Sequence, residues 1–182
     1  MNKSVYDSPE STAVSKRHIL TVLVDNEPGV LARVIGLFSG RGYNIESLTV
    51  AEVEWKLSLS RISIVTSGTP MVIEQIKSQL ARLVPIHSVR DLTEMGAAIE
   101  RELALVKIIN EGKNRIEALR IADTFRARTL DSTLNSFVFE ITGNSSKVAA
   151  FVDLMRSLGD VEIARTGVSA ISRGNSVDLE AK

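Results

Sequence analysis

The sequence predicts an α+β protein of two domains, each with the element order βαββαβ and an antiparallel sheet that is covered by helices on one face. Two observations predict this fold. In the first half, segments rich in β-branched apolar residues alternate with segments whose apolar residues recur at helical spacing, and the second half repeats this order. The 182 residues are enough for two domains of about 80 residues each.

The first half contains four strand segments and two helical segments. The β-branched run Ile19–Val24 ends at a turn that contains Pro28, a residue that suits the first turn of a helix. The helical pattern then ends at Gly40 and Gly42. We expect a strand at 19–24, a helix at 28–40, strands at 45–53 and 59–66, a helix at 70–83 and a strand at 86–92. This order is that of the ferredoxin-like fold.

The second half aligns with the first at two offsets. Arg17–Asn26 matches Arg101–Asn110 at 84 residues (101 minus 17), and Ile62–Gly68 matches Phe137–Gly143 at 75 residues (137 minus 62). The second copy therefore has a shorter second strand and hairpin. We expect a strand at 103–109, a helix at 114–126, strands around 130–131 and at 136–142, a helix at 145–158 and a strand at 161–171.

The domain boundaries follow from composition and from the repeat. Residues 1–16 contain four serines, a proline and no apolar periodicity, so we expect a disordered leader. We expect the first domain at 17–92, a linker at 93–98, the second ferredoxin-like domain at 99–174 and a disordered tail at 175–182.

The composition excludes several classes of protein. The 22 basic and 22 acidic side chains cancel, which argues against nucleic acid or an anionic membrane as a partner. The absence of cysteine excludes a disulfide scaffold, a thiolate nucleophile and a cysteine-ligated metal. No apolar run approaches the roughly 20 residues of a membrane span, and the first residues lack the hydrophobic core that is typical of a signal peptide. We therefore expect a cytoplasmic protein.

The sequence predicts no catalytic residue and no metal site. His18 and His87 have no second histidine or carboxylate at metal-ligand spacing, so we interpret both as sheet residues. The chain also lacks a nucleophile elbow, a P-loop and a dinucleotide-binding loop. Phe137 and Phe139 share one face of a strand. They are either core residues, which the neutral charge favours, or the stacking platform of an RNA-binding tandem domain.

The turn between the first strand and the first helix is the best candidate for a ligand site. Gly29 permits close approach to the N–H groups of the first helical turn, and Asn26 offers both a donor and an acceptor. We expect Asn44, after the helix, to lie at the same end of the sheet, with Val30 and Ile45 as aliphatic neighbours. This set suits a free amino acid, although each residue is also an ordinary turn or helix former.

The same loops resemble a known family. They are similar to the ACT domain of the small regulatory subunit of acetohydroxyacid synthase, also called acetolactate synthase, and the similarity continues into the second domain. It is carried by Asp25–Leu31, Arg33–Ser39, Gly42–Val50, Leu59–Thr66, Arg101–Lys107 and Ala164–Val168. The hairpin around Trp55 departs from the family pattern, and we assign it no role.

The resemblance implies a homodimeric regulator without catalysis of its own. Its partner would be the catalytic large subunit, which holds thiamine diphosphate, FAD and Mg, so that this chain carries no cofactor. The family activates that subunit and confers feedback inhibition by valine in valine, leucine and isoleucine biosynthesis. Free valine would lie between two ACT domains, with Asn26, Gly29 and Val30 from one chain and Asn44 and Ile45 from the other. A stand-alone ACT-domain sensor that regulates another enzyme is the alternative.

Overall fold

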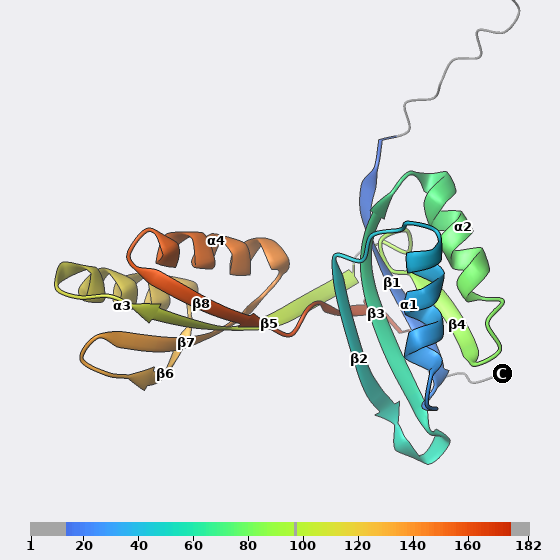
Figure 1. The fold of residues 1–182 in the computed structure, drawn as a ribbon, viewed down its shortest axis with the longest axis horizontal. Helices are drawn as coiled ribbons and strands as arrows, with labels where there is room; N and C mark the ends of the chain where they lie inside the picture. Colours follow the sequence, from blue (N-terminus) through green and yellow to red (C-terminus); the bar gives the residue numbers. More distant parts are fainter. Residues whose placement is uncertain (1–13, 97, 176–182) are drawn as a thin grey trace, which may run out of the picture.

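The computed structural model describes residues 14–96 and 98–175, which form two domains lying side by side (Figure 1). Most of the expected leader and tail lies outside the described residues. Lys16, placed in the leader by the sequence analysis, already belongs to the first strand. No helix in the described ranges has the length and apolar character needed to cross a membrane.

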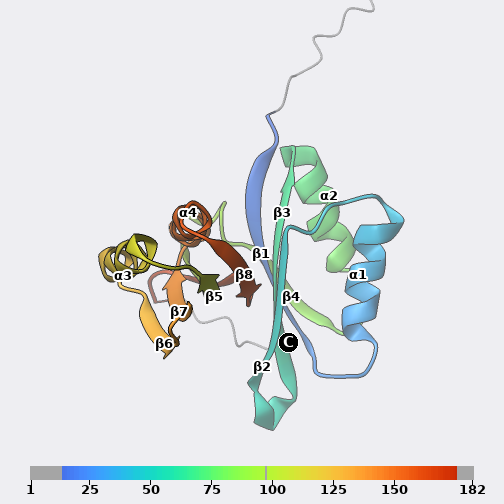
Figure 2. The same cartoon turned by 60° about the vertical axis from the view of Figure 1, so that its left-hand side comes forward.

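The N-terminal domain has the predicted order βαββαβ. Its elements are β1 (Lys16–Asp25), α1 (Val30–Gly40), β2 (Ser47–Glu54), η1 (Trp55–Leu57), β3 (Leu59–Gly68), α2 (Pro70–Leu80) and β4 (Ile86–Asp91). The strands pair antiparallel in the order β2-β3-β1-β4, so β2 and β4 are the sheet edges. Both helices cover the face of the sheet that points away from the C-terminal domain (Figure 2).

Helical periodicity explains how α1 and α2 pack on this sheet. Val30, Val34 and Phe38 recur every four residues, so α1 buries all three on one face. Pro70 occupies the first turn of α2, where its missing N–H costs no helical hydrogen bond. The buried side chains of both helices form one core with alternate residues of the two central strands, namely Leu20, Val22, Val24, Ile62 and Ile64.

The C-terminal domain repeats the same sheet order. Its elements are β5 (Ala98–Ile109), α3 (Lys113–Phe125), β6 (Arg128–Ser132), β7 (Ser136–Gly143), α4 (Ser145–Arg156), β8 (Asp160–Arg165) and β9 (Ser169–Ser172). The sheet runs β6-β7-β5-β8, with β9 pairing only with β5. Phe137 and Phe139 are buried in the core, and Phe139 meets Phe151 of α4 edge-on at 6.1 Å. Their interpretation as core residues is confirmed, which removes the stacking platform that the RNA-binding alternative requires.

The end of the chain differs from the prediction. The single strand expected at 161–171 is wrong, because the chain breaks at Gly167, whose φ of 83° no strand residue adopts. β8 stays in the C-terminal sheet, whereas β9 pairs with Ala98–Arg101 at the start of β5. Glu102–Ile109, the rest of β5, pairs with β7. One long strand therefore connects the β5–β9 ribbon to the C-terminal sheet, and it begins where the linker was expected to end.

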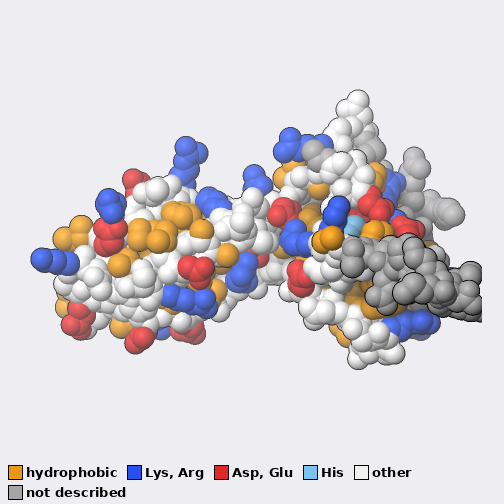
Figure 3. Space-filling model, turned by 90° about the horizontal axis from the view of Figure 1, so that it is seen from above, with side chains coloured by type: hydrophobic (Ala, Val, Ile, Leu, Met, Phe, Trp, Pro, Cys, Tyr) orange, Lys and Arg blue, Asp and Glu red, His pale blue; other side chains and the backbone are white. Residues whose placement is uncertain are grey.

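The β5–β9 ribbon packs on the face of the N-terminal sheet opposite its helices. Val168 and Ala170 are buried against Ile19, Val65 and Leu92. Residues on both faces of β1 are consequently buried, which explains why Ile19–Val24 is almost wholly apolar. The junction also carries charges of both signs (Figure 3), and two ion pairs lie there, Arg17 with Glu100 at 2.9 Å and Arg165 with Glu102.

Candidate functional site

The loop from β1 to α1 presents the open start of a helix. Gly29 is the N-cap of α1 with a φ of 87°, and no described side chain caps this helix. A Cβ at Gly29 would meet no atom within 4 Å, so the space in front of the helix is free. Val30 is buried in the core and fixes the first turn. The N–H groups of this turn are therefore placed to stabilise an anion such as a carboxylate.

The base of this loop is held by contacts to β4 and to the turns just before β3 and β4. The backbone N–H of Asn26 donates to the carbonyl of Ser58 at 2.7 Å, and that of Asp25 donates to the carbonyl of Pro85 at 2.9 Å. The Asp25 carboxylate also lies 2.6 Å from Nε2 of His87 on β4. The Asn26 side chain remains exposed above this base. The loop thus offers an amide beside the helix start on a fixed backbone.

The second predicted segment, between α1 and β2, is equally well fixed. The carbonyl of Asn44 accepts a hydrogen bond from Oγ1 of Thr66 at 2.7 Å, and the N–H of Glu46 donates to the carbonyl of Val65 at 2.8 Å. Asn44 itself is exposed, whereas Ile45 is half-buried and packs on the N-terminal core. An amide and an aliphatic side chain are therefore presented together at the start of β2.

The expectation that both loops lie at one end of the sheet is wrong. Asn26 contacts Ser58, just before β3, whereas Asn44 contacts Thr66, near the end of β3. The eight residues between these contacts (66 minus 58) span about 26 Å of extended strand. Helix α1 carries the chain back along the strand direction, so the loops at its two ends lie at opposite ends of the sheet. A single chain therefore does not bring Asn26, Gly29 and Val30 together with Asn44 and Ile45.

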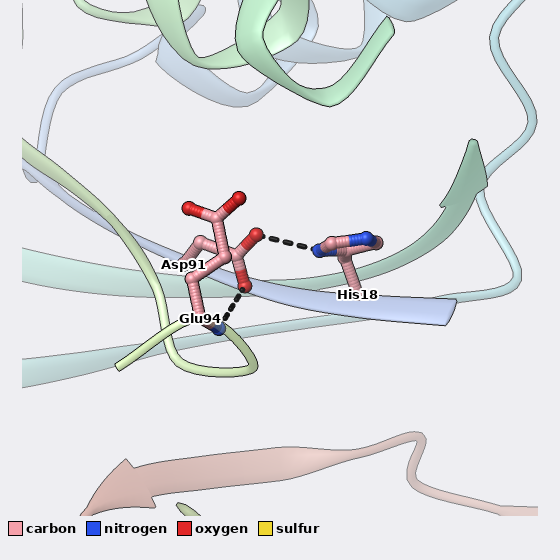
Figure 4. Close-up of side chains that lie close together, drawn as sticks. All are labelled: His18, Asp91 and Glu94. Atoms are coloured by element: carbon pink, nitrogen blue, oxygen red, sulfur yellow. Dashed lines mark hydrogen bonds and ion pairs between the residues drawn. The ribbon is translucent and has the colours of Figure 1, made fainter. Parts of the chain in front are cut away.

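Both histidines are sheet residues, as expected, but each has a carboxylate partner that is distant in the sequence. Nδ1 of His18 lies 2.6 Å from one oxygen of Asp91, and the other oxygen accepts the N–H of Thr93 at 2.9 Å and that of Glu94 at 3.4 Å (Figure 4). One oxygen of Asp91 thus closes the turn after β4, and the other connects this turn to β1.

This group includes three possible metal ligands, since the ligand atoms of His18, Asp91 and Glu94 lie within 4.8 Å of one another. The Glu94 carboxylate, however, pairs with Nζ of Lys77 at 2.8 Å. Hydrogen bonds to Glu74 and to Glu94 raise the pKa of Lys77, so the cation is well held. His18, Asp91 and Glu94 therefore each have a protein partner at or beside the turn after β4, and we interpret the group as structural.

Known proteins resemble this chain over both domains. A family model described as an AHAS small subunit-like ACT domain matches residues 20–88, and one described as the small subunit of acetolactate synthase matches residues 101–174. The probable acetolactate synthase small subunit of Archaeoglobus fulgidus is 47% identical over 159 residues, which cover 87% of this chain and 98% of that protein. The chain belongs to the acetolactate synthase small-subunit family.

Other members of the small-subunit family agree in sequence and in fold. The acetolactate synthase isozyme 3 small subunit of Escherichia coli is 46% identical over 162 residues, 88% of this chain and 98% of its own length. The crystal structure of the acetolactate synthase small subunit from Thermotoga maritima superposes with a TM-score of 0.79 at 37% identity, over 88% of this chain and 99% of that one. The two ferredoxin-like domains are thus the fold of a small subunit.

Sequence reasoning missed one contact between the domains of this small-subunit chain. Oγ of Ser47 accepts the N–H of Val168 at 2.8 Å, and Oγ1 of Thr49 donates to the carbonyl of Val168 at 2.9 Å. We call this pair of hydrogen bonds the Val168 clamp. The available signal was Gly167, an isolated glycine within a predicted strand, which often marks a bulge or a close approach of two backbones.

Proposed function

We propose that this chain binds the catalytic large subunit of acetolactate synthase, raises its activity and makes it sensitive to inhibition by valine. The observation that carries the proposal is the match of both domains, over nearly their full length, to proteins named acetolactate synthase small subunits. A small subunit implies a larger partner. In this proposal the partner performs the chemistry with its own thiamine diphosphate, FAD and Mg, and this chain holds no cofactor and acts with it in the cytoplasm.

A homodimer through the N-terminal domains would supply the missing half of the effector site. β2 is an edge strand of eight residues, paired only with β3 within the described chain. Antiparallel pairing of two β2 strands about a two-fold axis would place the Asn26 end of one sheet beside the Asn44 end of the other. The separation of the two loops in one chain is thus what such a dimer requires.

Exposed apolar side chains on the N-terminal domain support association. α1 exposes Leu31 and Ile35, which are four residues apart and so lie on one stripe, and β2 exposes Val50 and Val53. Surface apolar residues that are grouped in this way lose contact with water when two copies pair. Gly29 is the N-cap of α1 and Asn44 lies three residues before β2, which would link dimerisation to the effector site.

Valine suits the chemistry that such a site would offer. The N–H groups of the first turn of α1 would hold its carboxylate, and the side-chain oxygens of Asn26 and Asn44 would accept from its ammonium group. Ile45 and the edge of Val30 would face its isopropyl group. The loops of two chains would together supply all three recognition elements.

Inhibition would follow from linkage between two binding events. A ligand buried between two chains favours the dimer geometry to which it binds more tightly. When the catalytic subunit binds another geometry better, valine and that subunit weaken each other by the same factor, typically about 5- to 150-fold, or about 1–3 kcal/mol.

A reconstitution experiment tests this function. The purified chain is mixed with the catalytic subunit, and acetolactate formation from pyruvate is followed with and without valine. We expect no product from the chain alone, a higher rate after mixing and a lower rate after valine is added, with the catalytic subunit alone and valine as the control. No change in rate on mixing would overturn the proposal. A stand-alone sensor would instead bind another amino acid without affecting this enzyme.

A further inference from the structure

We infer that Ser47 and Thr49, through the Val168 clamp, hold the C-terminal domain on β2 and transmit the state of the effector site to it. The inference rests on the proposed function for its second part. Its first part, that the clamp fixes the position of the C-terminal domain, stands on the contacts alone.

The clamp consists of hydrogen bonds to both polar backbone groups of Val168. Ser47 accepts the N–H of Val168 and Thr49 donates to its carbonyl, so the two hydroxyls act like the ladder bonds of an extra strand. Ser47 and Thr49 are two residues apart on β2 and therefore point to the same face. The side chain of Val168 is buried beside them in the apolar cluster with Ile19 and Val65. The cluster holds the β5–β9 ribbon on the sheet, and the clamp fixes its position along β2.

Gly167 shows how closely the two backbones approach. A Cβ on this residue would lie 2.8 Å from Oγ of Ser47 and 3.0 Å from Cγ2 of Thr49, and the φ of 83° independently disfavours a side chain. The clamp therefore forms only because residue 167 is glycine. A contact that tolerates no added atom is sensitive to small displacements of β2.

The clamp lies close to the effector residues in the chain. Asn44 and Ile45 precede Ser47 by three and two residues, and the hydrogen bond from Glu46 to Val65 keeps the intervening backbone in the sheet. A ligand that binds Asn44, or a change in the pairing of β2 with a second copy, would therefore displace Ser47 as well. β2 would contact a second copy along its edge, and it would contact the C-terminal domain through the sheet face opposite the helices.

The other side of the clamp is connected to the C-terminal sheet. Thr166, two residues before Val168, bonds to Leu103 on β5 in both directions, with N–H···O at 3.0 Å and N–H···Oγ1 at 3.1 Å. A displacement of Val168 is thus passed to the long strand of the second domain. A pocket of about 450 Å³ between the domains, lined by Ser47, Gly167, Glu102 and Arg165 among others, leaves room for such movement.

The experiment removes the clamp without touching the effector residues. The double variant Ser47→Ala/Thr49→Val loses both hydroxyls, and the matched control Ser78→Ala/Thr129→Val makes the same changes at exposed positions away from the clamp. The chain contains no cysteine, so Met71→Cys and Ile116→Cys, at exposed sites on α2 and α3, take spin labels without background. Labelled chain is diluted with unlabelled chain, so that only distances within one chain are measured.

We expect the clamp variant to have a broader distance distribution between the domains than the control. We expect valine to bind it within threefold of its affinity for the unchanged chain, whereas its effect on the reconstituted enzyme falls at least about fivefold, the lower limit of typical coupling. Gly167→Ala, which disrupts the same contact from the segment between β8 and β9, should behave in the same way. Thermal unfolding of both variants verifies that they are folded.

An unchanged distance distribution in both variants would overturn the inference that the clamp fixes the C-terminal domain. Full valine inhibition in a variant whose distance distribution is broadened would overturn the inference that the clamp transmits the state of the effector site. Failure of valine to bind the unchanged chain would instead overturn the proposed function. In that case the distance distributions still decide whether the clamp holds the domain.

Discussion

Replacement of Gly29 by Asp tests the effector site at the start of α1. The φ of 87° costs an L-residue about 1–2 kcal/mol, with Asp among the better tolerated side chains. A carboxylate at a helix N-terminus stabilises the helix by about 0.3–1 kcal/mol, which offsets part of this cost. Because a Cβ there meets no atom within 4 Å, no collision adds to this cost. The free energy of unfolding should therefore fall by only about 1 kcal/mol.

The effect on valine should be much larger than the effect on stability. The new carboxylate would lie where the site is proposed to hold the carboxylate of valine. Two like charges about 4 Å apart repel by about 4 kcal/mol at an effective dielectric constant of 20. Because the loop is exposed, we take half of this value, about 2 kcal/mol, which corresponds to roughly 30-fold weaker binding. Activation of the catalytic subunit should be retained.

The second domain offers a matched control. Gly112 is the N-cap of α3, with a φ of 58°, no capping side chain in the described chain and open space around its Cβ position. Gly112→Asp should cost more stability in urea unfolding than Gly29→Asp, because its ψ of −131° lies outside the left-handed helical region, but it should leave valine inhibition of the reconstituted enzyme unchanged. The reasoning is refuted when Gly29→Asp keeps a valine inhibition constant within threefold of normal, or when Gly112→Asp changes it to the same extent.

Three further changes test other parts of the structure. Asn44→Ala should abolish valine inhibition and keep activation in the same assay, and intact inhibition would remove Asn44 from the site. Phe139→Ala should lower the free energy of unfolding by about 3–5 kcal/mol in urea titrations, because the ring is fully buried; a loss below about 1 kcal/mol would contradict this core assignment. Lys77→Met should cost up to about 1 kcal/mol near neutral pH. Its raised folded pKa means that the stabilisation is present below the ordinary lysine pKa of 10.5 and is lost as the pH rises through the folded pKa, so the difference between variant and parent should disappear in strongly alkaline buffer.

The order of elements was predictable from sequence because local patterns and burial agree. Val30, Val34 and Phe38 recur at the helical period, and the structure buries all three against the sheet. The apolar run Ile19–Val24 predicted a strand, and the structure shows why it is almost wholly apolar: it has helices on one side and the β5–β9 ribbon on the other. Low but periodic similarity between the halves also predicted the order βαββαβ in the second half, which the structure confirms for β5 to β8.

Two errors came from information that local patterns do not hold. Gly167 looks like any glycine in a strand, and only the approach of β2 to within contact distance shows that the strand must break there. The two predicted site loops were placed at one end because each has the composition of a turn, but the eleven residues of α1 carry the chain to the opposite end. The length of the helix was the signal that could have prevented the second error.

The long strand β5 has a consequence for how the molecule unfolds. Its first four residues pair with β9 against the N-terminal sheet, and its remaining eight belong to the C-terminal sheet. A cut before Ala98 would leave Ile19, Val65 and Leu92 facing water without the ribbon that covers them. The amide protons of β5 should therefore exchange with solvent at rates set by the opening of both domains, and calorimetry should record one cooperative transition. The duplicated halves resemble two domains in sequence, but they should melt as one.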